Sequence, residues 1–175
     1  MPHNRMARVV AGVVMALAAS ALTALPQGKG ILTQKTISLD MARAMAEGAL
    51  EKCRADGYHV SVHVIDASGL DKIALRDDGS SETNFTVSRE KAFTALTYSR
   101  PTSVMEKNWE HMSPARIIPG MFAVGGGLPI KAGDEIIGAI GVGGGKGKGE
   151  GQAHDSVMAE ACAAAGLAKV ADLLK

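Results

Sequence analysis

Glycine makes up nearly half of residues 125–151, and this stretch constrains the fold more than any other feature. Two short apolar segments, Leu128–Lys131 and Glu135–Val142, lie within it. A flexible Gly/Ser linker buries nothing and would not contain such segments. A buried strand normally avoids glycine because each one costs backbone entropy. The combination predicts a hairpin whose bare backbone is approached closely by something else, either a ligand or a neighbouring subunit.

The N-terminus predicts an export signal. Arg5 and Arg8 precede the apolar run Val9–Leu17, and small residues follow with an A-x-A step at Ala19–Ala21. This order is typical of a secretory signal peptide, and the run is short for a membrane span, which needs about 20 apolar residues. We expect cleavage after Ala21 and a periplasmic or secreted protein. Cleavage after Ala24 and an uncleaved anchor are the alternatives.

The remaining chain has the length of one domain. We expect a signal peptide, a flexible lead-in and one folded domain, at residues 1–21, 22–36 and 37–175. The formal charge of +1 becomes slightly negative when the leader and its two arginines are removed. Without a basic excess, and with few aromatic residues, nucleic acid is not an expected partner.

The two cysteines, Cys53 and Cys162, each lie in a predicted helix among small apolar residues. We interpret them as two buried small hydrophobic residues rather than a disulfide. The alternative, a disulfide, needs Cα atoms within about 7 Å. That distance would require the first and last helices to be neighbours.

Hydrophobic periodicity predicts an α+β domain. The expected helices are Leu39–Arg54, Ser88–Tyr98, a short helix ending at Trp109, and Asp155–Leu174. The expected strands are His59–Ala67, Leu70–Arg76, Met121–Val124, Leu128–Lys131 and Glu135–Val142. Because the strands follow one another mainly as hairpins, we expect one antiparallel sheet of five strands flanked by helices.

The glycine-rich stretch does not fit a nucleotide-binding loop. A P-loop needs a glycine five positions before its Gly-Lys pair and a Ser or Thr after the lysine. Ile140 and Val142 occupy the first position for the two Gly-Lys pairs, and glycine follows both lysines. The G-x-G-x-x-G register of dinucleotide-binding folds also fails.

The histidines offer two candidate ligands. His59 and His63 lie on one strand face about 13 Å apart, too far to bind one metal together. His111 lies in a loop, where it is either an axial haem ligand or a solvated side chain. His154 precedes Asp155 at the expected start of the last helix, where it could contact an anion.

An ordered set of short motifs covers most of the mature chain. They are Val64–Gly69, Arg76–Gly79, Lys91-Ala92, Thr94-Ala95, Arg100–Thr102, Pro119-Gly120, Gly125–Ile130, Gly138–Val142, Asp155 and Ala161–Gly166. In order and spacing they resemble the GlcG/HbpS family, also called the haem-degrading domain family. The resemblance implies a profilin-like fold, with a five-stranded antiparallel sheet between helices, and homo-oligomers often as large as octamers.

Some members of this family bind haem, and exported members store haem or iron or sense redox state with a membrane kinase. The resemblance therefore implies an exported, oligomeric haem-binding protein. The iron ligand would be His111 or a threonine such as Thr102. The pocket would include the glycines Gly125, Gly126, Gly127 and Gly143, although the family commonly has a serine where this chain has Gly143.

Two other functions remain open at this point. One is a cofactor-independent enzyme acting on a small carboxylated metabolite such as a hydroxy acid. Its site would combine Lys91, His154 and Asp155 with the glycine backbone, and the lysine or histidine would act as acid or base. The other is a partner-sensing oligomeric module.

Overall fold

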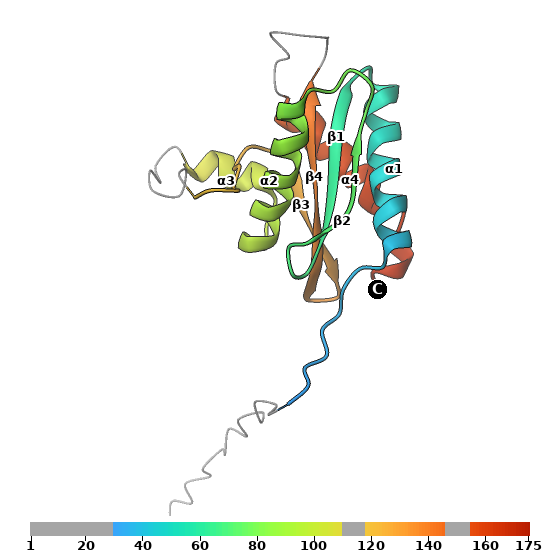
Figure 1. Ribbon diagram of the computed structural model, residues 1–175, viewed down its shortest axis with the longest axis vertical. Coiled ribbons are helices and arrows are strands. Elements are labelled where there is room, and N and C mark those ends of the chain that lie inside the picture. Colours follow the sequence, from blue (N-terminus) through green and yellow to red (C-terminus); the bar gives the residue numbers. More distant parts are fainter. Residues whose placement is uncertain (1–29, 110–117, 146–154) are drawn as a thin grey trace, which may run out of the picture. The chain divides into compact units, whose positions relative to one another are not determined.

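The computed structural model describes residues 30–109, 118–145 and 155–175 (Figure 1). Contacts divide the chain into residues 1–33 and a domain of residues 34–175. Within the described ranges, no helix combines the length and the apolar character needed to cross a membrane.

The domain has a four-stranded antiparallel sheet in the order β2-β1-β4-β3. The elements are α1 (Leu39–Ala55), β1 (His59–Asp66), β2 (Asp71–Arg76), α2 (Glu82–Tyr98), α3 (Thr102–Trp109), β3 (Gly127–Ala132), β4 (Glu135–Gly145), α4 (Ser156–Ala168) and the 3-10 helix η2 (Ala171–Leu173). The predicted α+β class and the antiparallel sheet are confirmed. The predicted fifth strand is wrong.

The fifth strand was expected at Met121–Val124, which lies outside the sheet. The backbone N–H of Phe122 donates to the Thr94 hydroxyl at 2.9 Å. Its partner is therefore a side chain of helix α2 rather than a neighbouring strand. Apolar spacing alone cannot distinguish a strand of the sheet from an extended segment that binds a helix, because both bury alternate side chains.

Capping side chains set where the helices begin. Ser38 is the N-cap of α1 and accepts from the N–H of Met41 at 3.2 Å, so α1 begins at the predicted Leu39. Helix α2 begins at Glu82 instead of Ser88, because Ser81 caps it and accepts from the N–H of Asn84 at 3.2 Å. Helix α4 ends at Ala168, well before the predicted Leu174, and η2 follows.

The sheet is covered on both faces, with α1 and α4 on one and α2 on the other (Figure 1). Strand β1 is buried on both sides for this reason. Val62 lies in the larger core cluster with Met45 of α1 and Cys162 of α4. Ile65, which points the other way, packs with Ala92 of α2.

Glycines in β4 allow α2 to lie directly on the sheet. A Cβ on Gly141 would collide with the carbonyl oxygen of Ser88, and one on Gly143 would lie 2.5 Å from the carbonyl oxygen of Asn84. The predicted close approach to the glycine-rich strand is confirmed, but at these two positions the approaching group is α2 of the same chain rather than a ligand or a neighbouring subunit.

Cys53 and Cys162 form a disulfide, so our interpretation of them as free buried residues is wrong. Their Cα atoms are 5.6 Å apart, one in α1 and one in α4. The two helices come this close because small residues face each other: a Cβ on Gly166 would collide with the carbonyl oxygen of Met45 and lie 3.2 Å from the Ala49 Cβ.

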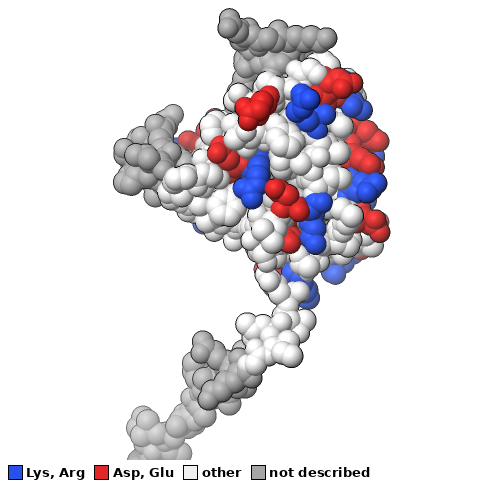
Figure 2. Space-filling view, in the orientation of Figure 1, with Lys and Arg blue, Asp and Glu red and all other residues white. Residues whose placement is uncertain are grey.

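Acidic and basic side chains are interspersed on the face of the domain shown in Figure 2. Exposed pairs include Lys52–Asp56 at 2.6 Å and Arg89–Asp71 at 3.1 Å. Exposed pairs of this kind each contribute less than about 1 kcal/mol to stability. The stability of the domain therefore depends on its two core layers and its disulfide.

Replacing both cysteines by alanine should lower the free energy of unfolding by about 2–4 kcal/mol, because the disulfide closes a long loop in the unfolded chain. Urea denaturation measures this loss. A thiol reductant should lower the midpoint of the wild-type protein toward that of Cys53→Ala/Cys162→Ala and leave the double variant unchanged. Equal midpoints for the wild-type protein with and without reductant would contradict a stabilising disulfide.

Candidate functional site

A groove of about 500 Å³ lies between α3 and α4, within the range of small-molecule sites. It is lined by Ser103, Glu106, Lys107, Ser156, Val157, Glu160, Ala161 and Ala164. Val157, Ala161 and Ala164 of α4 form an apolar wall, in which Val157 is 81% exposed, and Ser156 and the carboxylate of Glu160 lie beside it on the same helix. The α3 side carries hydroxyl, carboxylate and ammonium groups. The groove thus has an apolar wall on α4 bordered by polar groups from both helices, among them the carboxylates of Glu106 and Glu160.

Glu106 connects three segments at the base of this groove. Its Oε2 accepts from the N–H of Gly125 at 3.0 Å, and its Oε1 accepts from the Ser156 hydroxyl at 3.0 Å. We call this arrangement the Glu106 bridge. A Cβ on Gly125 would lie 2.8 Å from the Cβ of Ser156, so only glycine fits beside the bridge.

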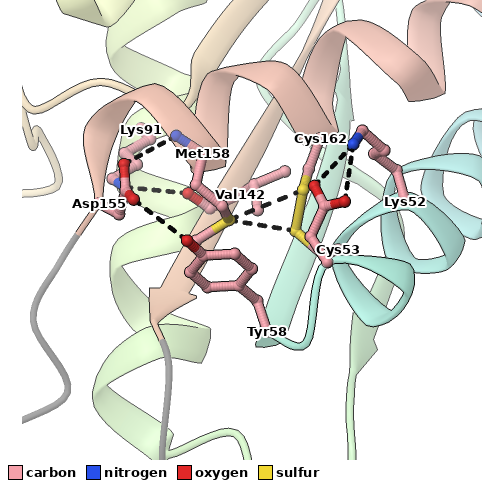
Figure 3. Close-up of a disulfide and its surroundings, with 9 residues drawn as sticks. Lys52, Cys53, Tyr58, Lys91, Val142, Asp155, Met158 and Cys162 are labelled. Carbon is pink, nitrogen blue, oxygen red and sulfur yellow. Dashed lines mark hydrogen bonds and ion pairs between the residues drawn. A yellow bond between two sulfur atoms is a disulfide. The ribbon is translucent and has the colours of Figure 1, made fainter.

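Lys91 of α2 is fully buried behind the Glu106 bridge. Its Nζ donates to the carbonyl oxygen of Val142 on β4 at 2.9 Å (Figure 3). A Cβ on Gly126 would lie 3.0 Å from that Nζ. Burial lowers the pKa of Lys91 from 10.5 to about 7, and the negative charge of Glu106 partly opposes this shift. The amine is therefore close to half neutral at physiological pH.

Thr102 holds the start of β3. It is fully buried, and its hydroxyl accepts from the N–H of Gly127 at 2.8 Å and donates to the carbonyl oxygen of the same residue at 3.5 Å. A Cβ on Gly127 would collide with the carbonyl oxygen of Lys91. Thr102 as an iron ligand stays a prediction, and in this structure its hydroxyl positions the Gly127 backbone.

Asp155 begins α4. Its Oδ1 accepts from the N–H of Met158 at 2.9 Å, and its Oδ2 accepts from the Tyr58 hydroxyl at 3.3 Å (Figure 3). The sulfur of Met158 lies 3.4 Å from that of Cys53. Both Asp155 oxygens thus hold the first turn of α4 beside the disulfide. Its predicted acid–base role is untested.

The structure brings some of the predicted site residues together. Lys91, Thr102 and Gly125–Gly127 lie side by side behind the groove rather than on its walls. Gly143 lies against the start of α2 instead. His111 and His154 lie outside the described residues, so their roles as ligands or catalysts stay predictions.

Sequence reasoning missed the groove residues Lys107, Ser156 and Val157, and it did not foresee the hydrogen bonds of Glu106. The partners of Glu106 are 19 and 50 residues away along the chain. No local motif joins residues at such separations, and a lone glutamate in a polar helix is ordinary. The sequence offered one signal for the groove, which is that α4 carries apolar residues on all its faces. A helix of this kind does not leave one face to water, so its outer face is expected to be covered or to meet a ligand.

The two histidines on β1 do not meet. His63 is buried, its Nδ1 lies 2.8 Å from the Ser88 hydroxyl, and burial lowers its pKa. His59 Nδ1 lies 3.5 Å from Oδ2 of Asp77, whose pKa is lowered chiefly by its hydrogen bonds from Arg54. Across the described part of the chain, no three His, Cys, Asp or Glu side chains gather into a metal site.

The buried amine makes stability depend on pH. In the unfolded chain Lys91 regains a pKa of 10.5, against about 7 in the fold, so the unfolded state binds more protons between these values. The free energy of unfolding should therefore rise with pH across this window, by on the order of 3 kcal/mol. Lys91→Met should remove this rise, because methionine fills similar space without titrating.

Thermal melts from pH 6 to pH 10 measure the difference between the wild-type protein and Lys91→Met. Lys107→Met, at an exposed position in α3, is the matched control and should keep the wild-type slope. Parallel stability curves for the wild-type protein and Lys91→Met would show that the amine is solvated in the fold.

Comparison with known proteins places this architecture in one family. Residues 37–167 match the family model described as haem degrading protein HbpS-like. The chain is 33% identical to Protein GlcG of Escherichia coli K12 over 111 residues, which cover 63% of this chain and 83% of GlcG.

Solved structures agree with this assignment. A double mutant of Streptomyces reticuli HbpS superposes with a TM-score of 0.72 at 30% identity, covering 85% of this chain and 97% of HbpS. A PduOC:heme complex shares the fold at 17% identity, with a TM-score of 0.67 and coverage of 77% of this chain and 94% of PduOC. With its family model matched over most of the domain, this chain belongs to the HbpS-like family.

Proposed function

We propose that this protein is exported, assembles into homo-oligomers such as octamers, and binds haem in the groove between α3 and α4. The observation that carries the proposal is the groove itself, with an apolar wall on α4 and a cationic residue on α3. The family description, haem degrading protein, supports a haem-related role.

The groove residues fit the two chemical parts of haem. The macrocycle is flat and apolar, and Val157, Ala161 and Ala164 form a wall of small side chains on α4. The propionates are anionic, and Lys107 and Ser103 supply an ammonium and a hydroxyl on the facing wall. Glu106 is already engaged by Gly125 and Ser156, so it is not needed as an iron ligand.

His111 is the iron ligand in this proposal, since imidazole is a common axial ligand. It follows α3, which forms one wall of the groove and ends at Trp109. Bound haem would supply a redox-active iron centre. Storage of haem or iron, or redox sensing with a membrane sensor kinase, is the role we propose for it.

The disulfide supports the proposed export. Structural disulfides form and persist in oxidising compartments such as the periplasm and are rare in the cytosol. The Cys53–Cys162 bridge is buried within the core between α1 and α4. Together with the signal-peptide pattern at residues 1–21, it favours a periplasmic or secreted location.

Titration of the purified protein with haem should produce a Soret band, and His111→Ala should weaken or shift it. Val157→Glu should weaken haem binding by about tenfold or more, because it places a charge on the apolar wall. Leu70→Glu is the matched control: Leu70 is also exposed, but it lies outside the groove. Light scattering of the same samples measures the oligomeric state.

Saturating haem without a spectral change would overturn the proposal. Equal affinities for Val157→Glu and Leu70→Glu would move the haem site away from this groove.

A further inference from the structure

The two faces of strand β1 are held in different ways. Toward α1 and α4 the strand presents valines of the larger apolar cluster. Toward α2 it presents two buried polar side chains, Ser61 and His63. The Ser61 hydroxyl lies 2.9 Å from that of Ser80, just before α2, and His63 Nδ1 lies 2.8 Å from the Ser88 hydroxyl within α2. The contact of β1 with α2 therefore depends on buried hydrogen bonds as well as on apolar packing.

The hydrogen bonds around His63 determine which of its nitrogens carries the proton. The Ser88 hydroxyl has one hydrogen, which it donates to the carbonyl oxygen of Phe85 at 2.8 Å. Toward His63 the same oxygen is therefore an acceptor, and Nδ1 is the donor. Neutral His63 is the Nδ1–H tautomer, so a second proton enters at Nε2.

The charges that face His63 do little to stabilise a second proton. Opposite His63, β4 places Gly141 and β2 places Ala74, and neither is charged. Asp71 of β2 favours the imidazolium form and Arg89 of α2 opposes it, and these two side chains pair with each other at 3.1 Å. Burial has the largest effect and lowers the pKa of His63. A proton added while α2 is in place is therefore poorly compensated.

The opposite layer does not share this sensitivity. Helices α1 and α4 are joined by the Cys53–Cys162 disulfide and pack on the sheet through the larger apolar cluster. Helix α2 packs through a smaller cluster that includes Ile65 and Ala92, and it also buries Lys91 in the same contact. An element with less apolar burial separates at a lower free energy than the rest of a domain. Helix α2 is therefore the element that a buried charge would release first.

We propose that His63 makes the contact between β1 and α2 sensitive to acid, and that its protonation releases α2 from the sheet while the α1–α4 layer stays folded. Release would uncover the β4 backbone at Gly141 and Gly143, on which α2 lies. It would also separate Thr94 from the N–H of Phe122. This inference goes beyond the proposed haem binding and does not depend on it.

The direction of the pH dependence follows from the two states of His63. With α2 in place its pKa lies below 6.5, and with α2 released the solvated imidazole regains a pKa of about 6.5. The released state therefore binds more protons below about pH 6.5, and the equilibrium for release should rise by up to about tenfold per pH unit. The Lys91 amine acts mainly between pH 7 and 10.5, so the two groups act in different windows.

Hydrogen exchange of the purified protein, followed by mass spectrometry from about pH 4.5 to about pH 7.5, tests the proposal. After correction for intrinsic exchange rates, peptides of α2 should lose protection below about pH 6.5, and peptides of α1 should not. His63→Asn should abolish this loss, because its amide N–H can replace Nδ1–H toward Ser88 and does not titrate. His59→Asn, at a β1 histidine whose side chain is 39% exposed, is the matched control and should keep the wild-type profile.

Two variants at exposed positions test the same contact without altering the core. Asp71→Asn should increase the loss of α2 protection in acid, because it removes the carboxylate that favours the imidazolium form. Arg89→Met should decrease the loss, because it removes the opposing charge. Both variants break the same ion pair, so a purely structural effect of that pair would have the same sign in each. Lys91→Met should keep the wild-type loss below about pH 6.5.

An unchanged loss of α2 protection in His63→Asn would overturn the proposal. Simultaneous loss in α1 and α2 of the wild-type protein would show global unfolding in place of the release of one helix. Effects of the same sign in Asp71→Asn and Arg89→Met would exclude the imidazolium as the cause. None of these measurements uses haem, so their outcome is separate from that of the Soret titration.

Discussion

The direct contact between α2 and the glycine positions of the sheet is the constraint on which the rest of the structure depends. Carbonyl oxygens of α2 lie where Cβ atoms of Gly127, Gly141 and Gly143 would be. No other residue type permits this approach, because any Cβ would collide with the helix backbone. The same contact carries Lys91 into the sheet, where its amine meets the Val142 carbonyl oxygen.

The opposite layer positions the other half of the site. The disulfide and the facing small residues hold α4 against α1. Asp155 and Met158 then fix the first turn of α4 beside Tyr58 and Cys53. Ser156 reaches Glu106 only because this turn is held, so the groove between α3 and α4 depends on both faces of the sheet.

The Glu106 bridge separates two environments of different chemistry. On one side is an open groove with an apolar wall, which suits a large flat ligand. On the other side the Lys91 amine is fully buried and donates to the carbonyl oxygen of Val142, packed closely against the backbone of Gly126. The carboxylate of Glu106 thus lies between an open groove and a buried amine.

Local patterns in the sequence determined the fold class, the capped start of α1, the antiparallel hairpins and the family, because each depends on residues close together along the chain. Sequence reasoning also named Lys91, Thr102 and Gly125–Gly127 as candidate site residues. Only the tertiary structure decided the Cys53–Cys162 pairing, the loss of the fifth strand and the Glu106 bridge. Each of these depends on which distant segments come within bonding distance. The packing of the layers sets those distances, and local spacing along the chain carries no information about it.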